Sequence, residues 1–318
     1  MHKLKKILAL VVLAGSGVSL FVSVTHIQDI LDWWRLRDYT PSAEISQLAE
    51  STRMNNLGQK LFYVHDPEIL DKSEFQTSCT VGEETIVLGC YESHRRIYLY
   101  NVTDERLAGV EEVTAAHEML HAAYDRLSAK EKVEVNSLLQ EAYDRIKNDR
   151  IRKNIASYKE RDPNIVMNEL HSILGTEVRD LPKDLEEYYT RYFSDRSAVV
   201  TLSEAYSAEF EKREKQIAAY DAQLTNLNGE ITRMHADLEL QTQALNQEKT
   251  LLESMRGNPD AFNEGVGSYN AKVNEYNADV AKLKIFIDQY NTIVTKRNEI
   301  AVEERQLVDA IDTRAEQL

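Results

Sequence analysis

The feature that most restricts the fold of this chain is a heptad pattern in its C-terminal third. Apolar residues recur at alternating spacings of three and four over residues 217–255 and again over 266–294. The first series is Ile217, Tyr220, Leu224, Leu227, Ile231, Met234, Leu238, Leu245, Leu252 and Met255. The second series is Val266, Tyr269, Val273, Tyr276, Val280, Leu283, Ile287, Tyr290 and Val294. Between them Gly257 can cap a helix and Pro259 cannot continue one. The pattern predicts two long helices that fold back as an antiparallel coiled-coil hairpin.

Polar residues interrupt this apolar pattern at a few positions. Gln241 and Glu248 stand in the first series, and Arg297 and Glu304 occupy later positions of the second. We therefore expect the end near the C-terminus to be more loosely packed. The hairpin can serve as an arm that packs or dimerises the protein. Alternatively it is a spacer or a docking site for a protein partner.

A chemical signal lies in the middle of the chain, where residues 117–121 read His-Glu-Met-Leu-His. This HExxH motif falls in a segment, 110–127, whose pattern predicts a helix. Positions i and i+4 lie on one helical face, so His117 and His121 can share one zinc ion. The carboxylate of Glu118 can then reach a water in an open position on the metal and act as a general base.

A predicted strand precedes this helix at residues 96–102, which are rich in β-branched and aromatic side chains. A strand, a short connection and an HExxH helix together resemble the catalytic half of the zincin metallopeptidases. The resemblance covers residues 86–196, and its specific part is the motif alone. It implies a mainly α catalytic domain with a small β element, a zinc cofactor, and a strand that binds the substrate backbone at the cleft edge. The alternative for this strand is an ordinary strand of the core.

A zincin needs a third protein ligand for its metal. The metzincin pattern fails because residues 122–127 supply neither its Gly nor its third His. The gluzincin pattern takes a Glu from a later helix, and residues 165–174 predict one that carries Glu169. Asn168-Glu169 resembles the start of some gluzincin ligand helices. The sequence departs from that pattern at Ile173, where an Asp is expected.

Two alternatives to Glu169 remain open. If the helix continues through Gly175, Glu177 falls on the same apolar face and is an equally good ligand. His171 is a further option, but helical geometry turns it to the opposite side, which predicts a solvent-facing histidine.

Aromatic and charged residues alternate over 185–196. Zincins use a Tyr, His or Arg to hold the oxyanion of the tetrahedral intermediate. Tyr188, Tyr189, Tyr192 and Arg196 are the candidates here. The alternative is that the tyrosines pack the catalytic domain onto the following helix.

The N-terminus predicts where the protein acts. A short basic start is followed by residues 7–24, which carry no charge and are long enough to span a bilayer. The sequence therefore predicts a signal anchor at residues 1–26 in the cell membrane, with the catalytic domain extracytoplasmic. If the segment is instead cleaved as a signal peptide, the protein is secreted.

The chain has two cysteines, Cys79 and Cys90. They lie on either side of turn signals at 81–84 and a short strand-like run at 85–88. Their spacing suits no zinc finger, and an oxidising exterior favours a disulfide over two buried free thiols.

Composition limits the remaining choices. The chain has 53 acidic and 38 basic residues, a net charge of −15, which argues against nucleic-acid binding. We expect the anchor at 1–26, a catalytic domain at 27–200 and the hairpin at 201–318. The predicted function is zinc-dependent hydrolysis of peptide bonds in a peptide or protein substrate. The alternative is a non-enzymatic surface scaffold, or a regulator of a cell-wall hydrolase, with a structural or vestigial zinc site.

Overall fold

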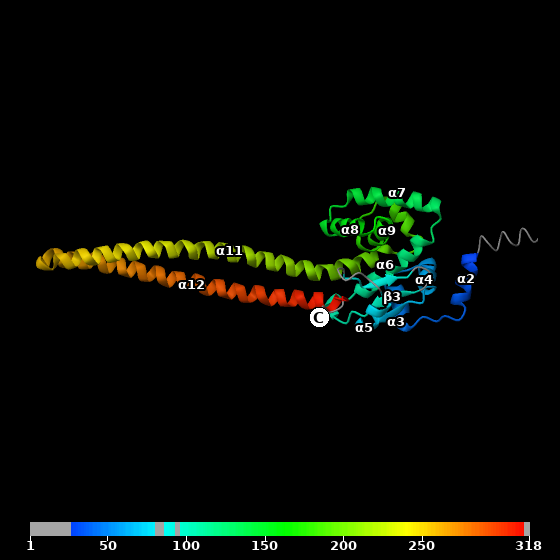
Figure 1. The fold of residues 1–318 in the computed structure, drawn as a ribbon, viewed down its shortest axis with the longest axis horizontal. Helices are drawn as coiled ribbons and strands as arrows, with labels where there is room; N and C mark the ends of the chain where they lie inside the picture. The colour runs from blue at the N-terminus through cyan, green and yellow to red at the C-terminus, as the bar shows by residue number, and fades with distance from the viewer. Residues whose placement is uncertain (1–26, 80–85, 93–95, 315–318) are drawn as a thin grey trace, which may run out of the picture. The chain divides into compact units, whose positions relative to one another are not determined.

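The computed structural model describes residues 27–79, 86–92 and 96–314 (Figure 1). The chain is mainly helical, with one small sheet and a long helical C-terminal region, which confirms the predicted fold class at that level. Two compact units divide it, with boundaries after Ser207 and after Asp309. The first unit contains the sheet, the shorter helices and the residues from Ala310 onward.

Nine helices of the described residues precede the long C-terminal region. They are α2 (Ile27–Leu36), α3 (Ala43–Ser51), α4 (Asn56–Tyr63), α5 (Lys72–Ser78), α6 (Val110–Asp125), α7 (Ala129–Arg145), α8 (Asp149–Arg161), α9 (Val166–Glu177) and α10 (Lys183–Tyr189). Helix α7 begins with the capping box that the sequence predicts. Its N-cap Ser128 accepts the backbone N–H of Glu131, whose carboxylate accepts the N–H of Ser128.

The sheet has three short strands, β1 (Glu68–Leu70), β2 (Gly89–Tyr91) and β3 (Ile97–Tyr100). Their order is β1-β3-β2, with β1 parallel and β2 antiparallel to β3. Of the two alternatives for the strand before the motif, the structure agrees with an inner strand and not with an edge strand. Strand β3 lies in the centre, and both of its sides are paired. The edge strand that packs against α6 is β2.

Helix α6 forms the centre of the first unit. Its inner face is fully buried at Ala115, Ala116, Met119 and Leu120. Helix α9 is its principal neighbour. A side chain at Gly175 of α9 would place its Cβ only 2.3 Å from Cδ1 of Leu120, so a glycine is required for this close approach. Helix α9 does not end before Gly175 but continues to Glu177, so this glycine allows close packing and does not end the helix.

Two long helices, α11 (Arg196–Ser254) and α12 (Pro259–Ile311), make up the second unit and its connections to the first. The predicted boundary at residue 201 lies inside α11.

Apolar and polar contacts join α11 to α12. Met234 and Leu238 are buried in a cluster with Leu283. The polar residues that interrupt the heptads also find partners: Gln241 donates to Asp279 at 2.8 Å, and Lys272 pairs with Glu248 at 2.7 Å. Arg297, where we expected looser packing, pairs with Asp221 at 3.1 Å.

In the described parts of the chain, no helix is both long enough and apolar enough to cross a bilayer. This finding contradicts the prediction that the protein is a single-pass membrane protein. Residues 7–24, on which that prediction was based, lie outside the described residues.

Candidate metal centre

Three side chains that can bind a metal meet between α6 and α9. They are His117 and His121 of α6 and Glu169 of α9, and one ligand atom from each lies within 4.8 Å of the others. The Glu169 carboxylate oxygen is 3.8 Å from Nε2 of His117 and 3.8 Å from Nε2 of His121. All three side chains are largely buried. The helical spacing of the motif and the packing of α9 on α6 create this group.

The arrangement fits a zinc ion. Tetrahedral zinc with bonds of about 2.1 Å holds neighbouring ligand atoms about 3.4 Å apart, a few tenths of an ångström less than the two 3.8 Å distances from Glu169. Two imidazole nitrogens and one carboxylate oxygen are also the donor set of many catalytic zinc sites, which keep the fourth position for water.

Glu118 lies next to this group and is 5% exposed. Burial raises the pKa of its carboxyl to about 7, and the Glu169 carboxylate adds to this effect, whereas His121 and the backbone N–H of Tyr91 oppose it. A carboxyl group with a pKa near neutrality can both accept and release a proton at physiological pH, as a general base must.

Glu169 is held in its ionised form. Burial opposes its ionisation, but hydrogen bonds from His117 and Tyr158 and the charge of the imidazoles outweigh burial and keep its pKa below the usual value. Tyr158 is not among the site residues that the sequence predicts. Its position on α8, one turn after the buried Ile155 and two turns after the buried Ile151, was the available signal, because the three share one face of that helix. Burial and the Glu169 carboxylate raise the pKa of Tyr158, so its phenol remains a donor.

The second histidine is oriented by a residue of α9. Nδ1 of His121 donates to Oδ1 of Asn168 at 3.0 Å, and Nδ2 of Asn168 donates to Asp125 at 3.4 Å. The proton on Nδ1 leaves the lone pair of Nε2 available for a metal. Asn168 therefore orients one histidine of the group, and its neighbour Glu169 carries the carboxylate of the group.

Replacement of Asn168 by Ala is expected to weaken zinc affinity by about 10- to 100-fold, because the imidazole of His121 loses its fixed tautomer and orientation. Competition with a chromogenic chelator measures this affinity. Asn164→Ala, which removes an exposed amide that donates to Asp162, is the matched control and should leave the affinity unchanged. An Asn168→Ala protein with wild-type affinity would show that the contact does not support the ligand.

The other two candidates for the third ligand lie outside the group. The carboxylate of Glu177 pairs with Arg150 at 2.6 Å and is not part of the group. His171 is fully buried, which corrects the expectation of a solvent-facing ring. Its Nε2 bonds the hydroxyl of Tyr188 at 2.9 Å, and its ring packs among tyrosines, because α9 is covered on that side by α10.

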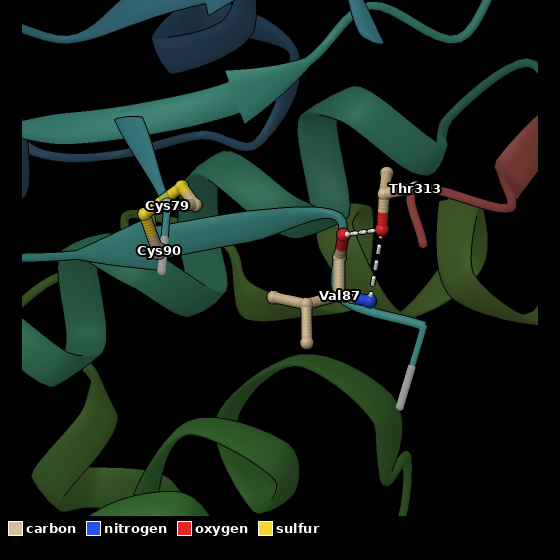
Figure 2. Close-up of a disulfide and its surroundings, with 4 residues drawn as sticks. All are labelled: Cys79, Val87, Cys90 and Thr313. Atoms are coloured by element: carbon tan, nitrogen blue, oxygen red, sulfur yellow. Dashed lines mark hydrogen bonds between the residues drawn. A yellow bond between two sulfur atoms is a disulfide. The ribbon is translucent and has the colours of Figure 1, made fainter. Parts of the chain in front are cut away.

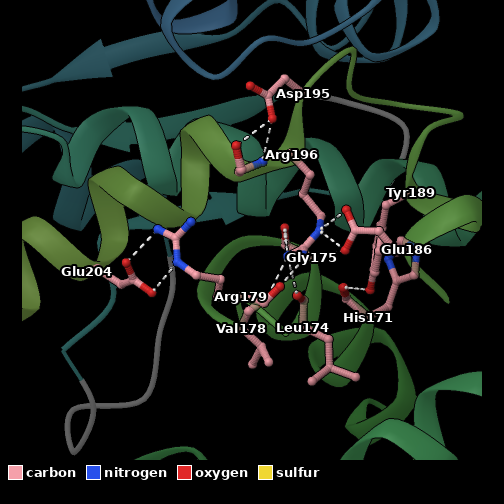
Figure 3. Close-up of polar contacts among 11 residues, drawn as sticks. His171, Leu174, Gly175, Val178, Arg179, Glu186, Tyr189, Asp195, Arg196 and Glu204 are labelled. Carbon is pink, nitrogen blue, oxygen red and sulfur yellow. Dashed lines mark hydrogen bonds and ion pairs between the residues drawn. The ribbon is translucent and has the colours of Figure 1, made fainter. Parts of the chain in front are cut away.

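The residues predicted as candidates to stabilise the oxyanion make their contacts within the protein core. The hydroxyls of Tyr188 and Tyr192 lie 3.1 Å apart, and Tyr189 donates to the carbonyl of His171. Figure 3 shows the guanidinium of Arg196 directed at the Glu186 carboxylate and at the end of α9. It donates to the carbonyls of Val178 and Arg179 and is 5% exposed, so it satisfies buried carbonyls instead of facing substrate.

Cys79 and Cys90 form a disulfide (Figure 2). It links the C-terminal end of α5 to the middle of β2.

No protein-family model matches this chain, and no curated protein or solved structure matches it. The resemblance to the zincins therefore rests on the motif and on the order of the surrounding elements.

Proposed function

We propose that this protein is a zinc-dependent peptidase, in which His117, His121 and Glu169 hold the metal and Glu118 is the general base. One observation carries the proposal: a buried carboxyl with a pKa near 7 stands beside a three-residue ligand group. A protein that only needed to bind zinc would have no use for this carboxyl, whose burial is costly.

The chemistry follows from these positions. When bound, zinc supplies a Lewis acid that polarises a carbonyl and lowers the pKa of water. Glu118 accepts the proton of the attacking water and later donates it to the leaving amine. Tyr158, whose hydroxyl already contacts Glu169, is our candidate for the donor to the developing oxyanion.

The alternative is a scaffold with a structural zinc site. Structural sites are closed by four protein ligands, and the group found among the described residues has three. This count favours a site with room for water.

We also propose that α11 and α12 form an antiparallel coiled-coil hairpin. Its contact partners run in opposite directions along the chain, since residues 221, 241 and 248 meet 297, 279 and 272. Such an arm suits a spacer or a partner-docking role.

Metal removal tests the function. The purified full chain should hydrolyse an unfolded protein such as casein, lose this activity on dialysis against a chelator, and recover it with stoichiometric zinc. Hydrolysis that persists after complete metal removal would rule out the proposed mechanism.

A further inference from the structure

Strand β2 touches the general base directly. The backbone N–H of Tyr91 donates to the Glu118 carboxylate. At Gly89 a Cβ would lie 2.8 Å from Oε1 of Glu118, 2.9 Å from its Cγ and 2.5 Å from a methyl of Thr114. Real Cβ atoms do not approach other atoms this closely, so any larger residue at 89 must displace β2 or Glu118. The Glu118 carboxylate is thus held on one side by the hydrogen bond from Tyr91 and packs on the other against the backbone of Gly89.

The pairing of β2 with β3 determines which way the backbone groups of Gly89 and Tyr91 point. Leu88 and Glu92 bond to β3, because Tyr100 donates to the Leu88 carbonyl and Glu92 donates to the Arg96 carbonyl. The alternate residues, among them Gly89 and Tyr91, therefore point their backbone groups away from β3. This outer edge meets Glu118. A strand of three residues with one neighbour is weakly held by pairing alone.

Two further restraints act on β2 from outside the sheet. Cys90, between Gly89 and Tyr91, is bonded to Cys79 at the end of α5. The hydroxyl of Thr313 donates to the carbonyl of Val87 at 2.7 Å and accepts its N–H at 3.4 Å (Figure 2). Thr313 belongs to the first unit and is 7% exposed. The disulfide and this two-way contact hold the same segment, residues 87–91.

We propose that β2, fixed by the Cys79–Cys90 disulfide and by Thr313, positions the Glu118 carboxylate for catalysis. The inference rests on the proposed peptidase function and assigns Gly89, Cys79, Cys90 and Thr313 as positioning residues. None of them belongs to the metal-ligand group. Their loss therefore affects proton transfer and leaves metal binding intact.

Steady-state kinetics of the zinc-loaded full chain test this proposal. Gly89→Ala should lower kcat by about 100-fold with little change in KM, the effect of a displacement of about 1 Å at a reacting group. The double variant Cys79→Ala/Cys90→Ala should lower kcat in the same way, and Thr313→Val, which keeps the side-chain shape, should do so to a smaller extent. Gly229→Ala is the matched control, because a Cβ there meets nothing within 4 Å.

Two readouts that do not depend on activity separate positioning from general damage. Zinc stoichiometry should stay at the wild-type value in every variant. Hydrogen exchange of the Tyr91 amide should be slow in the wild type and faster in the double cysteine variant, because its bond to Glu118 is lost.

The possible results are distinct. If Gly89→Ala and the double cysteine variant match the wild type in kcat, the inference is overturned. Loss of zinc together with activity would also overturn it, since β2 would then support the whole ligand group. If the wild type has no peptidase activity, the proposed function fails, whereas faster Tyr91 exchange without the disulfide would still establish the tether.

Discussion

Glu118→Gln is expected to abolish peptide hydrolysis and leave the metal in place. Gln has nearly the same shape and can still accept the N–H of Tyr91, but it cannot take a proton from water. Loss of a general base lowers kcat by about 100- to 10,000-fold. Zinc content should remain at the wild-type level, because Glu118 is not a member of the ligand group. Kinetics and metal analysis on one preparation measure both effects.

The same substitution should stabilise the metal-free protein at neutral and alkaline pH. Folding raises the pKa of Glu118 from 4.5 to about 7, so between these values the folded state holds a proton that the unfolded chain has released. The contribution of Glu118 to the free energy of unfolding is thus most favourable below pH 4.5 and falls as pH rises to 7. The full difference is about 3 kcal/mol.

Denaturant unfolding of the metal-free protein at pH 4.5 and pH 8 checks this sign. Glu118→Gln should exceed the wild type in stability at pH 8, and the gap should close at pH 4.5. Glu112→Gln, on the same helix and outside the ligand group, is the control for a change of charge. Equal stability of the Glu118→Gln and wild-type proteins at pH 8 would mean that the Glu118 carboxyl is not buried at a cost.

Glu169→Gln should remove the metal, whereas Glu177→Gln should not. Glu169 offers the one carboxylate among the three ligand atoms, and its replacement removes a negative charge from the site. Zinc affinity should fall by at least about 100-fold, more than the loss of an outer contact causes. Glu177 lies outside the ligand group and pairs with Arg150, so Glu177→Gln should leave zinc affinity at the wild-type level.

Isothermal titration of both variants with zinc distinguishes them, because each differs from the wild type by the same chemical change on the same helix. If instead Glu177→Gln loses zinc and Glu169→Gln binds it normally, the third ligand is Glu177, and the assignment of Glu169 is wrong.

Local periodicity explains what the sequence could predict. The spacing of His117 and His121 fixes their common face, and the heptads fix two long helices, because both patterns depend on neighbours along one helix. The choice between Glu169 and Glu177 depends instead on Arg150, which is 27 positions from Glu177 in the chain. No pattern within α9 contains that information.

The same reason explains why the sequence could not decide the position of β3 in the sheet and did not point to Tyr158. The pairing of β3 with β1 and β2 on its two sides is a tertiary property, and a central strand differs little from an edge strand in four residues. Tyr158 contacts Glu169 across the packing of α8 on α9. His171 looks polar and outward on a helical wheel, yet α10 covers it with Tyr188 and Tyr189.

The zinc stoichiometry of the purified full chain tests the central claim most directly. After dialysis against excess zinc and removal of unbound metal, plasma emission spectroscopy should find one zinc per wild-type chain and none in His121→Ala. A wild-type chain without zinc, or a His121→Ala chain with as much zinc as the wild type, would contradict a metal centre built on His117, His121 and Glu169.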